Sequence, residues 1–600
     1  TVTALNDSNC SASAINMTGS ATVLSGKTWN GTTNTDWNTG SNWSGGTIPT
    51  AMDCVVIPNV TNDPIISGSC YNGLAYTLTI QNGGFLTVNS TNSITVTNFV
   101  NVDTGGTFNI KNSASLVQID NVTNTGNINM ERFTQPMYRY DYTYWGSPVT
   151  QASGFTLGNL SPGSSLRYTW IPSVGGLSGN WVGASSATIM TTAKGYIVRA
   201  PDSFSTNPAI KVPFTANFIG TPNNGDILTP ISHGTMGTIA TDDKWNLLGN
   251  PYPSAVNAAT FLDNATNEGL LDGTIYFWTH NSPPDTAFPD PFYASFVVNY
   301  TASDYASWNK TGGVGTIAST GGPAPDGFIA AGQSFFARSL GVTGNAVFNN
   351  SMRSASYSNS QFFRQTNPTT SVASPVGNIE RHRIWLNLTN NTGAFSQILV
   401  GYVQGATLGR DRNFDGDRLG GNGVNLYSII PDVNLGIQGR PLPFDVNDQV
   451  TLGYNAIATG TFSIRIDHID GLFNTQNIYL EDKLLQVIHD IKQAPYVFTT
   501  AAGNFNNRFV LRYTYSTLGN EIFNLNNIVQ VITNEKATVY SSYETIKDII
   551  VYDVLGRKID EYQNVGVTQF ILRNLNRTTN TLIVKITLEN GMVVTQKIIY

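Results

Sequence analysis

Short stretches in which apolar and polar residues alternate occupy most of the chain, and this pattern predicts an all-β protein. In residues 1–135 the apolar positions come in pairs with one residue between them, and successive pairs are six to eleven residues apart. The pairs are Leu86/Val88, Ile94/Val96, Val100/Val102, Phe108/Ile110, Val117/Ile119 and Ile128/Met130. One pair is too small to bury a core by itself, so the pairs must stack. We predict a β-solenoid-like stack, with a flattened sandwich as the alternative.

Three tryptophans precede these pairs, in the run TWNGTTNTDWNTGSNW. If Trp29, Trp37 and Trp43 were exposed, they could hold sugar rings. If they were buried, they would cap the open end of the stack, where the first coil has no neighbour to cover it. We expect capping.

Residues 136–355 contain an apparent internal duplication. Tyr144–Val149 (YWGSPV) parallels Leu247–Tyr252 (LLGNPY), and Ala193–Ala200 parallels Ala331–Arg338. In both halves an aromatic or apolar strand leads into a Gly-x-Pro turn, and a long insert precedes a second strand. This order predicts a duplicated β-domain built from two related units.

Aromatic residues are dense in the duplicated region. They are Trp145, Trp170, Trp181, Trp245, Tyr276, Phe277, Trp278, Tyr293 and Trp308. They can pack between the two repeats, or they can form a platform for carbohydrate. The segment Asn257–Asp263 (NAATFLD), after Ser254, predicts a short helix.

A stretch rich in Ser, Thr, Asn and Pro, residues 356–377, predicts a linker. Alternating runs resume in residues 378–520, for example at Ile384/Leu386/Leu388 and Phe462/Ile464/Ile466. About eight strands with turns between them predict a jelly-roll-like β-sandwich.

The last two strands, Thr581–Leu588 and Met592–Tyr600, flank Asn590-Gly591, which is a strong hairpin dipeptide. A two-residue loop would mix apolar and polar residues on each face, whereas a three-residue loop with a left-handed Gly591 keeps one face apolar. The second register pairs Leu588 with Met592, Ile586 with Val594 and Leu582 with Ile598. We predict this register, within a C-terminal Ig-like sandwich over residues 526–600.

The runs VYDVLGRKI, starting at Val551, and LIVKITLENGMVVTQKIIY, ending at Tyr600, carry a resemblance. Together they resemble the C-terminal sorting domain, in its type C form, of type IX secretion cargo in Bacteroidota. The motif order, the strand-turn-strand pattern and the terminal position all agree with that domain. The upstream regions resemble β-rich surface proteins of the same bacteria.

The resemblance implies export across the outer membrane to the cell surface or medium. It implies a SprA-type translocon and a PorV-like shuttle as partners, with any signal peptide already removed before Thr1. The implied sorting signal comprises Val551, Tyr552, Asp553, Leu555, Gly556, Arg557, Lys585, Asn590, Gly591 and Lys597.

The composition of the chain limits the number of domains and the kinds of partner that can be expected. Six hundred residues exceed a single core, so about three to five domains are expected. Only 12 % of residues are charged, the net charge is -7, and no cluster of Lys and Arg could follow a phosphate backbone. We therefore expect no nucleic acid partner. No apolar run reaches the roughly 18 residues of a transmembrane segment.

Cysteine and acidic positions suggest two further features. Cys54 and Cys70 flank a short segment and are the preferred disulfide, which leaves Cys10 free or in an alternative pair. The run Asp411, Asn413, Asp415, Gly416, Asp417 has oxygen ligands at alternate positions before and after a glycine, as calcium loops do. It departs from the EF-hand form because Asn422, and not Glu, stands at the twelfth position. The alternative is an Asp-rich turn in which neighbouring arginines pair with the acids.

Motifs of established enzymes are absent from the sequence: no HExxH, GxSxG or P-loop occurs among its residues. Thr279-His280-Asn281 and Asp290 form a polar cluster that could line a cleft. The sequence favours a non-enzymatic adhesin or a structural component of the cell surface or of gliding motility. The alternative is a polysaccharide-active enzyme or a carbohydrate-binding protein that contacts surface glycans.

Overall fold

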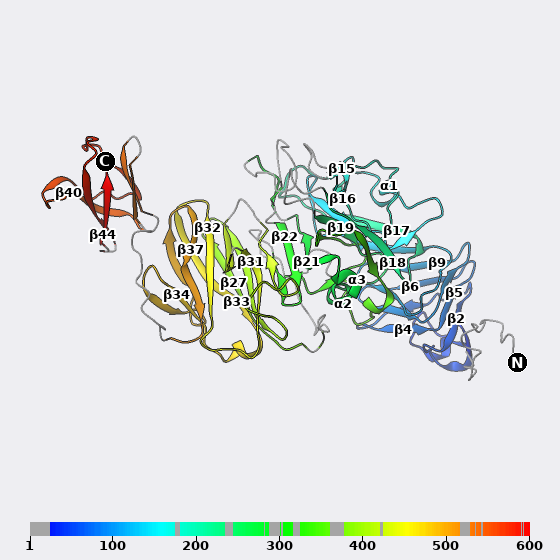
Figure 1. The fold of residues 1–600 in the computed structure, drawn as a ribbon. Coiled ribbons are helices and arrows are strands. Elements are labelled where there is room, and N and C mark those ends of the chain that lie inside the picture. The colour runs from blue at the N-terminus through cyan, green and yellow to red at the C-terminus, as the bar shows by residue number, and fades with distance from the viewer. Residues whose placement is uncertain are drawn as a thin grey trace. The chain divides into compact units, whose positions relative to one another are not determined.

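The computed structural model describes residues 25–600 except 174–180, 235–243, 281, 287–299, 302–303, 316–323, 361–376, 378, 420–423, 432, 516–528, 534–535, 542–543, 590 and 592. The regular secondary structure of the described chain is almost entirely β-strand, as the alternation predicts (Figure 1). It divides into two compact units: unit 1 is residues 1–316, 322–379 and 412–416, and unit 2 is residues 317–321, 380–411 and 417–600. No described helix is long and apolar enough to cross a membrane.

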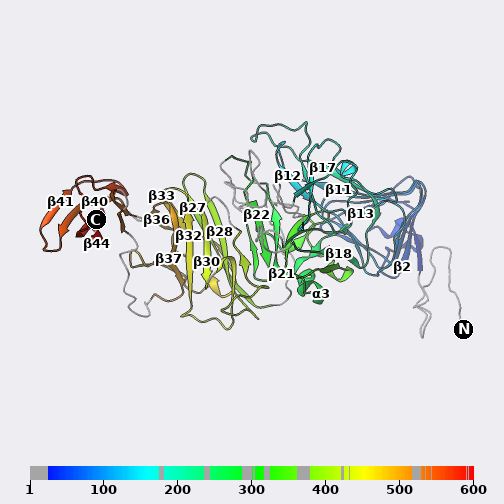
Figure 2. The ribbon, with the colours of Figure 1, turned by 45° about the horizontal axis from the view of Figure 1, so that its top comes forward.

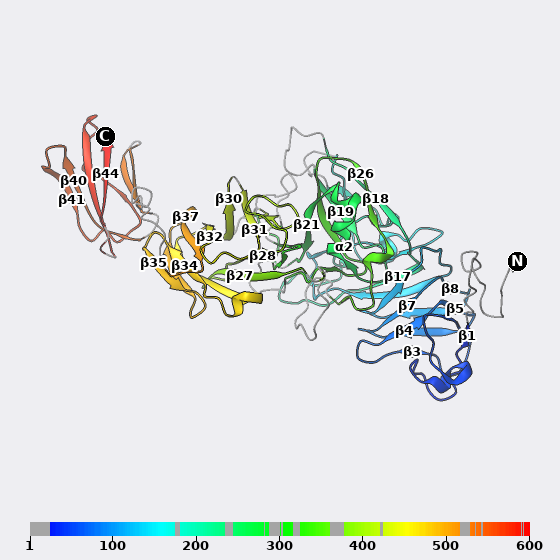
Figure 3. The same ribbon diagram turned by 60° about the horizontal axis from the view of Figure 1, so that its bottom comes forward.

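Unit 1 begins with a parallel β-solenoid whose coils have three faces (Figure 3). The first sheet contains β1 (Ser25–Thr28), β2 (Asp53–Ile57), β5 (Thr77–Ile80) and β8 (Val100–Val102); the second contains β4 (Asn72–Ala75), β7 (Ser93–Val96) and β10 (Ser115–Gln118); and the third contains β3 (Ile65–Ile66), β6 (Phe85–Val88), β9 (Thr107–Ile110), β11 (Ile128–Phe133), β17 (Thr215–Pro222) and β13 (Val149–Thr150). Val55 pairs with Leu78, and Leu78 with Val100, so one coil takes 22 or 23 residues here. The predicted stack is confirmed.

The three tryptophans of the opening run cap this solenoid. Trp29, Trp37 and Trp43 are all buried, and Trp43 meets each of the other two edge-on, with ring centroids 4.9 and 4.7 Å apart. The Trp43 indole N–H donates to the carbonyl of Trp37 at 2.9 Å, and that of Trp29 to the carbonyl of Asn62 at 2.7 Å. Burial of the rings confirms capping and excludes them as a sugar-holding surface.

Two sheets of equivalent strand order follow, and they confirm the duplication. The first is β12 (Tyr142–Trp145), β16 (Tyr196–Arg199), β14 (Arg167–Trp170) and β15 (Trp181–Gly183); the second is β19 (Trp245–Gly249), β25 (Ser334–Ser339), β21 (Leu271–Trp278), β22 (Tyr305–Asn309) and β23 (Gly312–Val314). Two further pairs complete unit 1: β18 (Ile227–Ile231) with β26 (Gly344–Phe348), and β20 (Val256–Asn257) with β24 (Phe328–Ile329).

The two repeats exchange backbone contacts reciprocally. Gly146 N–H donates to Gly332 O, and Gly249 N–H donates to Ala193 O, each at 2.9 Å. Ala193 and Gly332 both have a left-handed backbone, with φ of 61° and 75°. This reciprocity is the mark of a pseudo-twofold axis.

Strand pairing corrects the sequence alignment of the second motif by one residue. Tyr144 lies opposite Ile197, and its counterpart Leu247 lies opposite Phe336. Ile197 is therefore equivalent to Phe336 and not to Phe335. The first motif could be aligned on its Gly-x-Pro turn, whereas the second has no comparable fixed point.

Helical segments are few and short. The predicted helix is present as α2 (Ala258–Asp263), where the Asn257 side chain accepts the Thr260 N–H as an N-cap. The remaining helical segments among the described residues are α1 (Leu157–Leu160), α3 (Ala265–Glu268) and the 3-10 turns η2 (Gly40–Asn42), η3 (Ser44–Gly46), η5 (Asn350–Met352) and η6 (Gly471–Asn474).

The start of the predicted linker is part of the folded core of unit 1. Asn359 is buried and donates through its amide to Ala114 O at 2.6 Å, while Ala331 N–H donates to the Asn359 amide oxygen at 2.8 Å. Just upstream, the buried Arg353 donates to Leu116 O at 2.8 Å. These bonds join the solenoid to the duplicated domain, so the two predicted domains form one unit.

Unit 2 begins with a single large sheet that folds over its own core (Figure 2). In order its strands are β35 (Val487–Asp490), β34 (Tyr479–Asp482), β37 (Gly503–Arg512), β32 (Gln449–Ala456), β30 (Asn425–Ile430), β31 (Val433–Arg440), β28 (Phe395–Val403), β27 (Arg381–Asn390), β33 (Gly460–Ile469) and β36 (Tyr496–Thr500), with β29 (Gly416–Asp417) beside β31. This is the predicted sandwich, although β28 and β31 pair in parallel, with Leu399 opposite Ile437, where a jelly roll would be antiparallel.

The C-terminal region is the predicted two-sheet Ig-like sandwich. One sheet contains β38 (Val529–Thr533), β39 (Ala537–Ser541) and β42 (Gln569–Ile571), and the other contains β41 (Lys558–Tyr562), β40 (Ile546–Asp553), β43 (Thr581–Leu588) and β44 (Val593–Ile599). Seven strands are typical of such sandwiches. Val539, Val551, Val584 and Ile586 are among its fully buried core residues.

We expect Gly146→Ala to lower the free energy of unfolding of unit 1 by about 1–3 kcal/mol, the usual cost of overpacking. A Cβ on Gly146 would lie 2.7 Å from the Gly249 Cα, and neither backbone can withdraw without breaking its bond to the other repeat. Urea unfolding of the full chain measures the change.

The matched control is Gly183→Ala, since a Cβ there meets nothing within 4 Å. It should unfold as the wild type does. Equal stability of the two variants would contradict the close approach of the repeats.

Candidate functional sites

The terminal hairpin of the C-terminal sandwich has the predicted register. The described pairs that the three-residue loop requires are present, Ile586 with Val594 and Leu582 with Ile598. Gly591 is left-handed, with φ of 84°, and its N–H donates to Leu588 O at 2.9 Å. Asn590 and Met592, and with Met592 the third predicted pair, lie outside the described residues.

The VYDVLGR motif forms a tight turn between β40 and β41. The Asp553 carboxylate accepts the backbone N–H groups of Leu555 at 3.0 Å and Arg557 at 2.9 Å, and Gly556 is left-handed with φ of 79°. The Arg557 N–H is the largest of the contacts that hold the pKa of the Asp553 carboxyl below its usual value. The turn presents Val554 and Leu555 outward, 63 % and 90 % exposed.

The other implied sorting residues divide between the core and the outer face of the same sheet. Val551 is fully buried, and Tyr552 is half-buried. Lys585 and Lys597 are exposed, and Lys597 lies opposite Ile583. The motif therefore combines core positions with an outward face that carries two cations and an apolar turn.

The four predicted calcium ligands are divided between the two units. Asn413 and Asp415 belong to unit 1, whereas Asp411 and Asp417 belong to unit 2. Within unit 1 the Asn413 amide donates to the Glu268 carboxylate at 3.4 Å.

In unit 2, Asp417 forms an ion pair with Arg410, and the Asp411 carboxylate accepts the backbone N–H of Thr407. No group of three or more His, Cys, Asp or Glu side chains in the described part of the chain is arranged to hold a metal ion. The arginine pairing is the arrangement of an Asp-rich turn, and calcium binding stays a prediction.

The predicted disulfide between Cys54 and Cys70 is wrong. Cys54 is disulfide-bonded, but Cys70 is free and exposed. Cys54 lies in β2 of one solenoid face, and Cys70 lies in the turn before β4, which belongs to another face. Sequence proximity therefore did not bring the two sulfur atoms together. Cys10, the remaining cysteine of the sequence, lies outside the described residues.

The aromatic residues of the duplication pack between the repeats. Tyr144 stacks on Trp278 with ring centroids 5.7 Å apart, and its hydroxyl lies 2.6 Å from that of Tyr305. The Trp170 indole N–H donates to Trp245 O at 2.6 Å. All five side chains are buried, so they form no carbohydrate platform. Tyr293 lies outside the described residues.

Part of the polar cluster around His280 is buried at the end of this aromatic layer. His280 Nδ1 lies 3.4 Å from the Asp141 carboxylate, and Lys211 Nζ lies 3.5 Å from the same oxygen. Burial raises the pKa of Asp304 to about 8, although its carboxylate accepts both the N–H and the hydroxyl of Ser282. A pKa above neutrality favours the uncharged form of Asp304, which is the form that burial tolerates. Asn281 and Asp290 lie outside the described residues.

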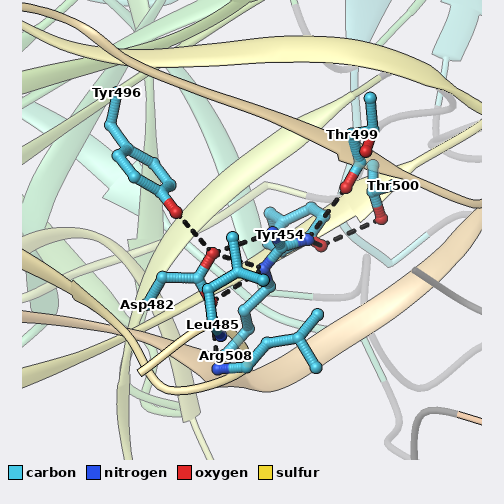
Figure 4. Close-up of polar contacts among 8 residues, drawn as sticks. Tyr454, Asp482, Leu485, Tyr496, Thr499, Thr500 and Arg508 are labelled. Carbon is cyan, nitrogen blue, oxygen red and sulfur yellow. Dashed lines mark hydrogen bonds and ion pairs between the residues drawn. The ribbon is translucent and has the colours of Figure 1, made fainter. Parts of the chain in front are cut away.

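A further buried polar network lies in the sandwich, where the sequence suggested no site (Figure 4). The Arg508 guanidinium and the Tyr496 hydroxyl each donate to Asp482 Oδ2 at 2.8 Å. Arg508 also donates to Thr499 O at 3.0 Å and to the Tyr454 hydroxyl at 3.4 Å. Burial is the largest single influence and lowers the pKa of Arg508, but the hydrogen bonds and charge attraction of Asp482 and Tyr454 together outweigh it, so the net shift of the pKa is upward.

Strand parity would have revealed Asp482, although not its partner. Asp482 lies two residues after the core residue Leu480 on β34, so it occupies an inward position where only a paired charge is tolerated. The network ties β34 to β37 and β36 and leaves no open position for a substrate between Asp482 and Arg508. It is a structural support.

Two family models match the sequence. Residues 28–513 match a model described as a domain of unknown function (DUF8693), and residues 518–600 match one described as a domain of unknown function (DUF8694). No curated protein matches the sequence. The first match spans the solenoid, the duplicated domain and the large sandwich together, whereas the C-terminal sandwich is matched separately.

We expect Arg508→Met to destabilise the chain by about 3–5 kcal/mol, because it leaves the carboxylate of Asp482 buried without its countercharge. Urea unfolding measures this loss. As a control, Lys558→Ala removes the surface partner of Glu561 and should leave the midpoint unchanged. If Arg508→Met matched the wild type, the pair would not support the sandwich.

We expect a maleimide reagent to label Cys70 in the native chain and to leave Cys54 unlabelled until the chain is reduced and unfolded, because only the former is a free, exposed thiol. Peptide mass spectrometry locates the label. The variant Cys70→Ser should lose that label, and labelling of Cys54 without reduction would contradict the assignment.

Proposed function

The chain belongs to the DUF8693 family, and from its architecture we propose that it is a non-enzymatic surface protein exported by type IX secretion. In this proposal the C-terminal sandwich is the sorting domain, and residues 28–513 are the displayed body. The body acts as an adhesin or as a structural component of the cell surface or of gliding motility.

The observation that carries the proposal is the exposed turn Val554-Leu555. A side chain as apolar as Leu555 that is 90 % exposed, held in a turn fixed by Asp553 and Gly556, is suited to insertion into a partner. The turn belongs to the run that resembles the sorting motif. Its rigidity lowers the entropy cost of binding.

The separate family match of residues 518–600 supports a module with its own role. Its seven strands enclose their own core, so the domain can be recognised as a unit. A SprA-type translocon and a PorV-like shuttle are the partners that the proposal assigns to it. Lys585 and Lys597, exposed on the same sheet as the turn, add a positive face for such contacts.

The non-enzymatic proposal for residues 28–513 is supported by the contacts of side chains that could have formed an active site. Asp482 and Arg508 are buried against each other, and Asp304 is capped by Ser282. The aromatic residues of the duplicated domain are buried between its two halves. These groups thus stabilise the fold.

Deleting residues 526–600 should abolish appearance of the body at the cell surface of a Bacteroidota host that carries the pathway. A sharper test is Leu555→Asp, which keeps the fold because the side chain is exposed. Burying a leucine contributes about 1.5–3 kcal/mol, so surface display should fall about tenfold or more. Surface proteolysis and immunoblotting of cell fractions give the measurement.

The matched control is Ile532→Asp on β38, which changes another exposed apolar side chain (40 % exposed) of the same domain. It should be displayed normally. Unchanged display after the deletion would refute the sorting role, and unchanged display of Leu555→Asp alone would place the recognition surface elsewhere on the domain.

A further inference from the structure

Two of the three solenoid faces are covered along part of their length. All four residues of β10 are buried, because Leu116 N–H donates to Pro253 O at 2.9 Å and Arg353 and Asn359 bond to the same segment. All five residues of β2, on another face, are buried as well. The outward side chains of these strands are therefore not available to a ligand.

The third face is open along four neighbouring strands. We call the outward, accessible side chains of β6, β9, β11 and β17 the ladder face: Phe85, Thr107, Asn109, Asn129, Glu131, Phe133, Thr215, Asn217, Ile219 and Thr221. Their register aligns them in rows across the sheet, for example Asn109, Asn129 and Ile219 in one row and Phe85 and Thr107 in another. Neighbouring strands lie about 4.8 Å apart, so the rows have a regular repeat.

The ladder face is rich in amides and hydroxyls and carries almost no charge. Glu131 is its one ionisable side chain, and Lys111 at the end of β9 pairs with it at 2.8 Å. The Asn129 amide donates to the Asn109 amide oxygen at 3.2 Å, which orients both side chains along the row. A ligand that docks here would displace water from neutral groups, without the cost of stripping an unpaired charge.

Apolar side chains are spaced among these polar groups. Phe85, Phe133 and Ile219 are 37 %, 42 % and 47 % exposed, and they lie on three different strands, β6, β11 and β17. The face therefore alternates apolar contact points with hydrogen-bonding groups over several strands. It lacks the continuous apolar patch that is typical of stable protein–protein interfaces.

We propose that the ladder face binds an uncharged polysaccharide. A sugar ring presents C–H faces that pack on Phe or Ile, and hydroxyl groups that both donate to and accept from Asn and Thr side chains. An acidic glycan or a nucleic acid would need unpaired cations, and the nearby Lys111 is already neutralised by Glu131. The inference rests on the proposed adhesin function and assigns it a binding surface and a ligand class.

The test is a set of depletion isotherms of the purified full chain on amorphous cellulose, chitin and mannan, with pectate and heparin beads as charged comparisons. We expect the chain to be retained on at least one uncharged polymer and to show no specific retention on the charged beads. The double variant Phe133→Ala/Ile219→Ser should weaken that retention about tenfold or more, as loss of two apolar contacts implies.

Two further variants distinguish a loss of binding from a loss of folding. Asn129→Asp adds a charge to the face without changing size and should also weaken retention. Leu228→Ser removes a 60 % exposed apolar side chain from β18, away from the face, and should bind as the wild type does. Unfolding midpoints establish that each variant is folded.

Retention on no uncharged polymer, or equal retention of the face variants and wild type, would overturn the proposal. Two other results would also overturn the proposal: self-association of the chain, or preferential binding to the charged beads, if the face variants abolish it. In either case the ladder face would serve another partner. The two proposals can fail separately. If the chain binds no uncharged polymer but its export still depends on residues 526–600, the polysaccharide proposal is refuted and the secretion proposal is not.

Discussion

The close approach of Gly146 and Gly249 is the constraint on which the centre of the protein depends. Each glycine donates to the other repeat's left-handed residue, Gly332 or Ala193, so the two sheets are held at a distance set by bare backbone. That distance brings Tyr144 and Trp170 of one repeat against Trp278 and other rings of the second. A side chain at either glycine would separate the layers and open the aromatic core.

The features predicted from sequence are those that a local pattern determines. Pairs such as Leu86/Val88 implied stacked rungs because an isolated pair buries too little, and the apolar parity of Ile586 and Val594 implied the hairpin register. The motif around Asp553 predicted a turn because Asp and Gly supply its hydrogen bonds and its left-handed residue. In each case the deciding interaction lies within a few residues or within one strand pair.

The features that were missed depend on contacts between distant segments. Cys54 and Cys70 are close in sequence, but the solenoid coil places them on different faces. Asn359 was assigned to a linker because its neighbours are Ser and Asn, whereas it is bonded to Ala114. Asp482 could have been found from its inward parity, but its partner Arg508, on another strand, could not be identified by spacing alone.

The reciprocal repeats have a kinetic consequence. Because Gly146 N–H bonds Gly332 O, the joint between the two repeats cannot form until Gly332, far along the chain, has been synthesised. Such high contact order slows folding and leaves the intermediate exposed. During synthesis the aromatic faces that the second repeat later covers are open to solvent, so they can contact other chains before the repeats join.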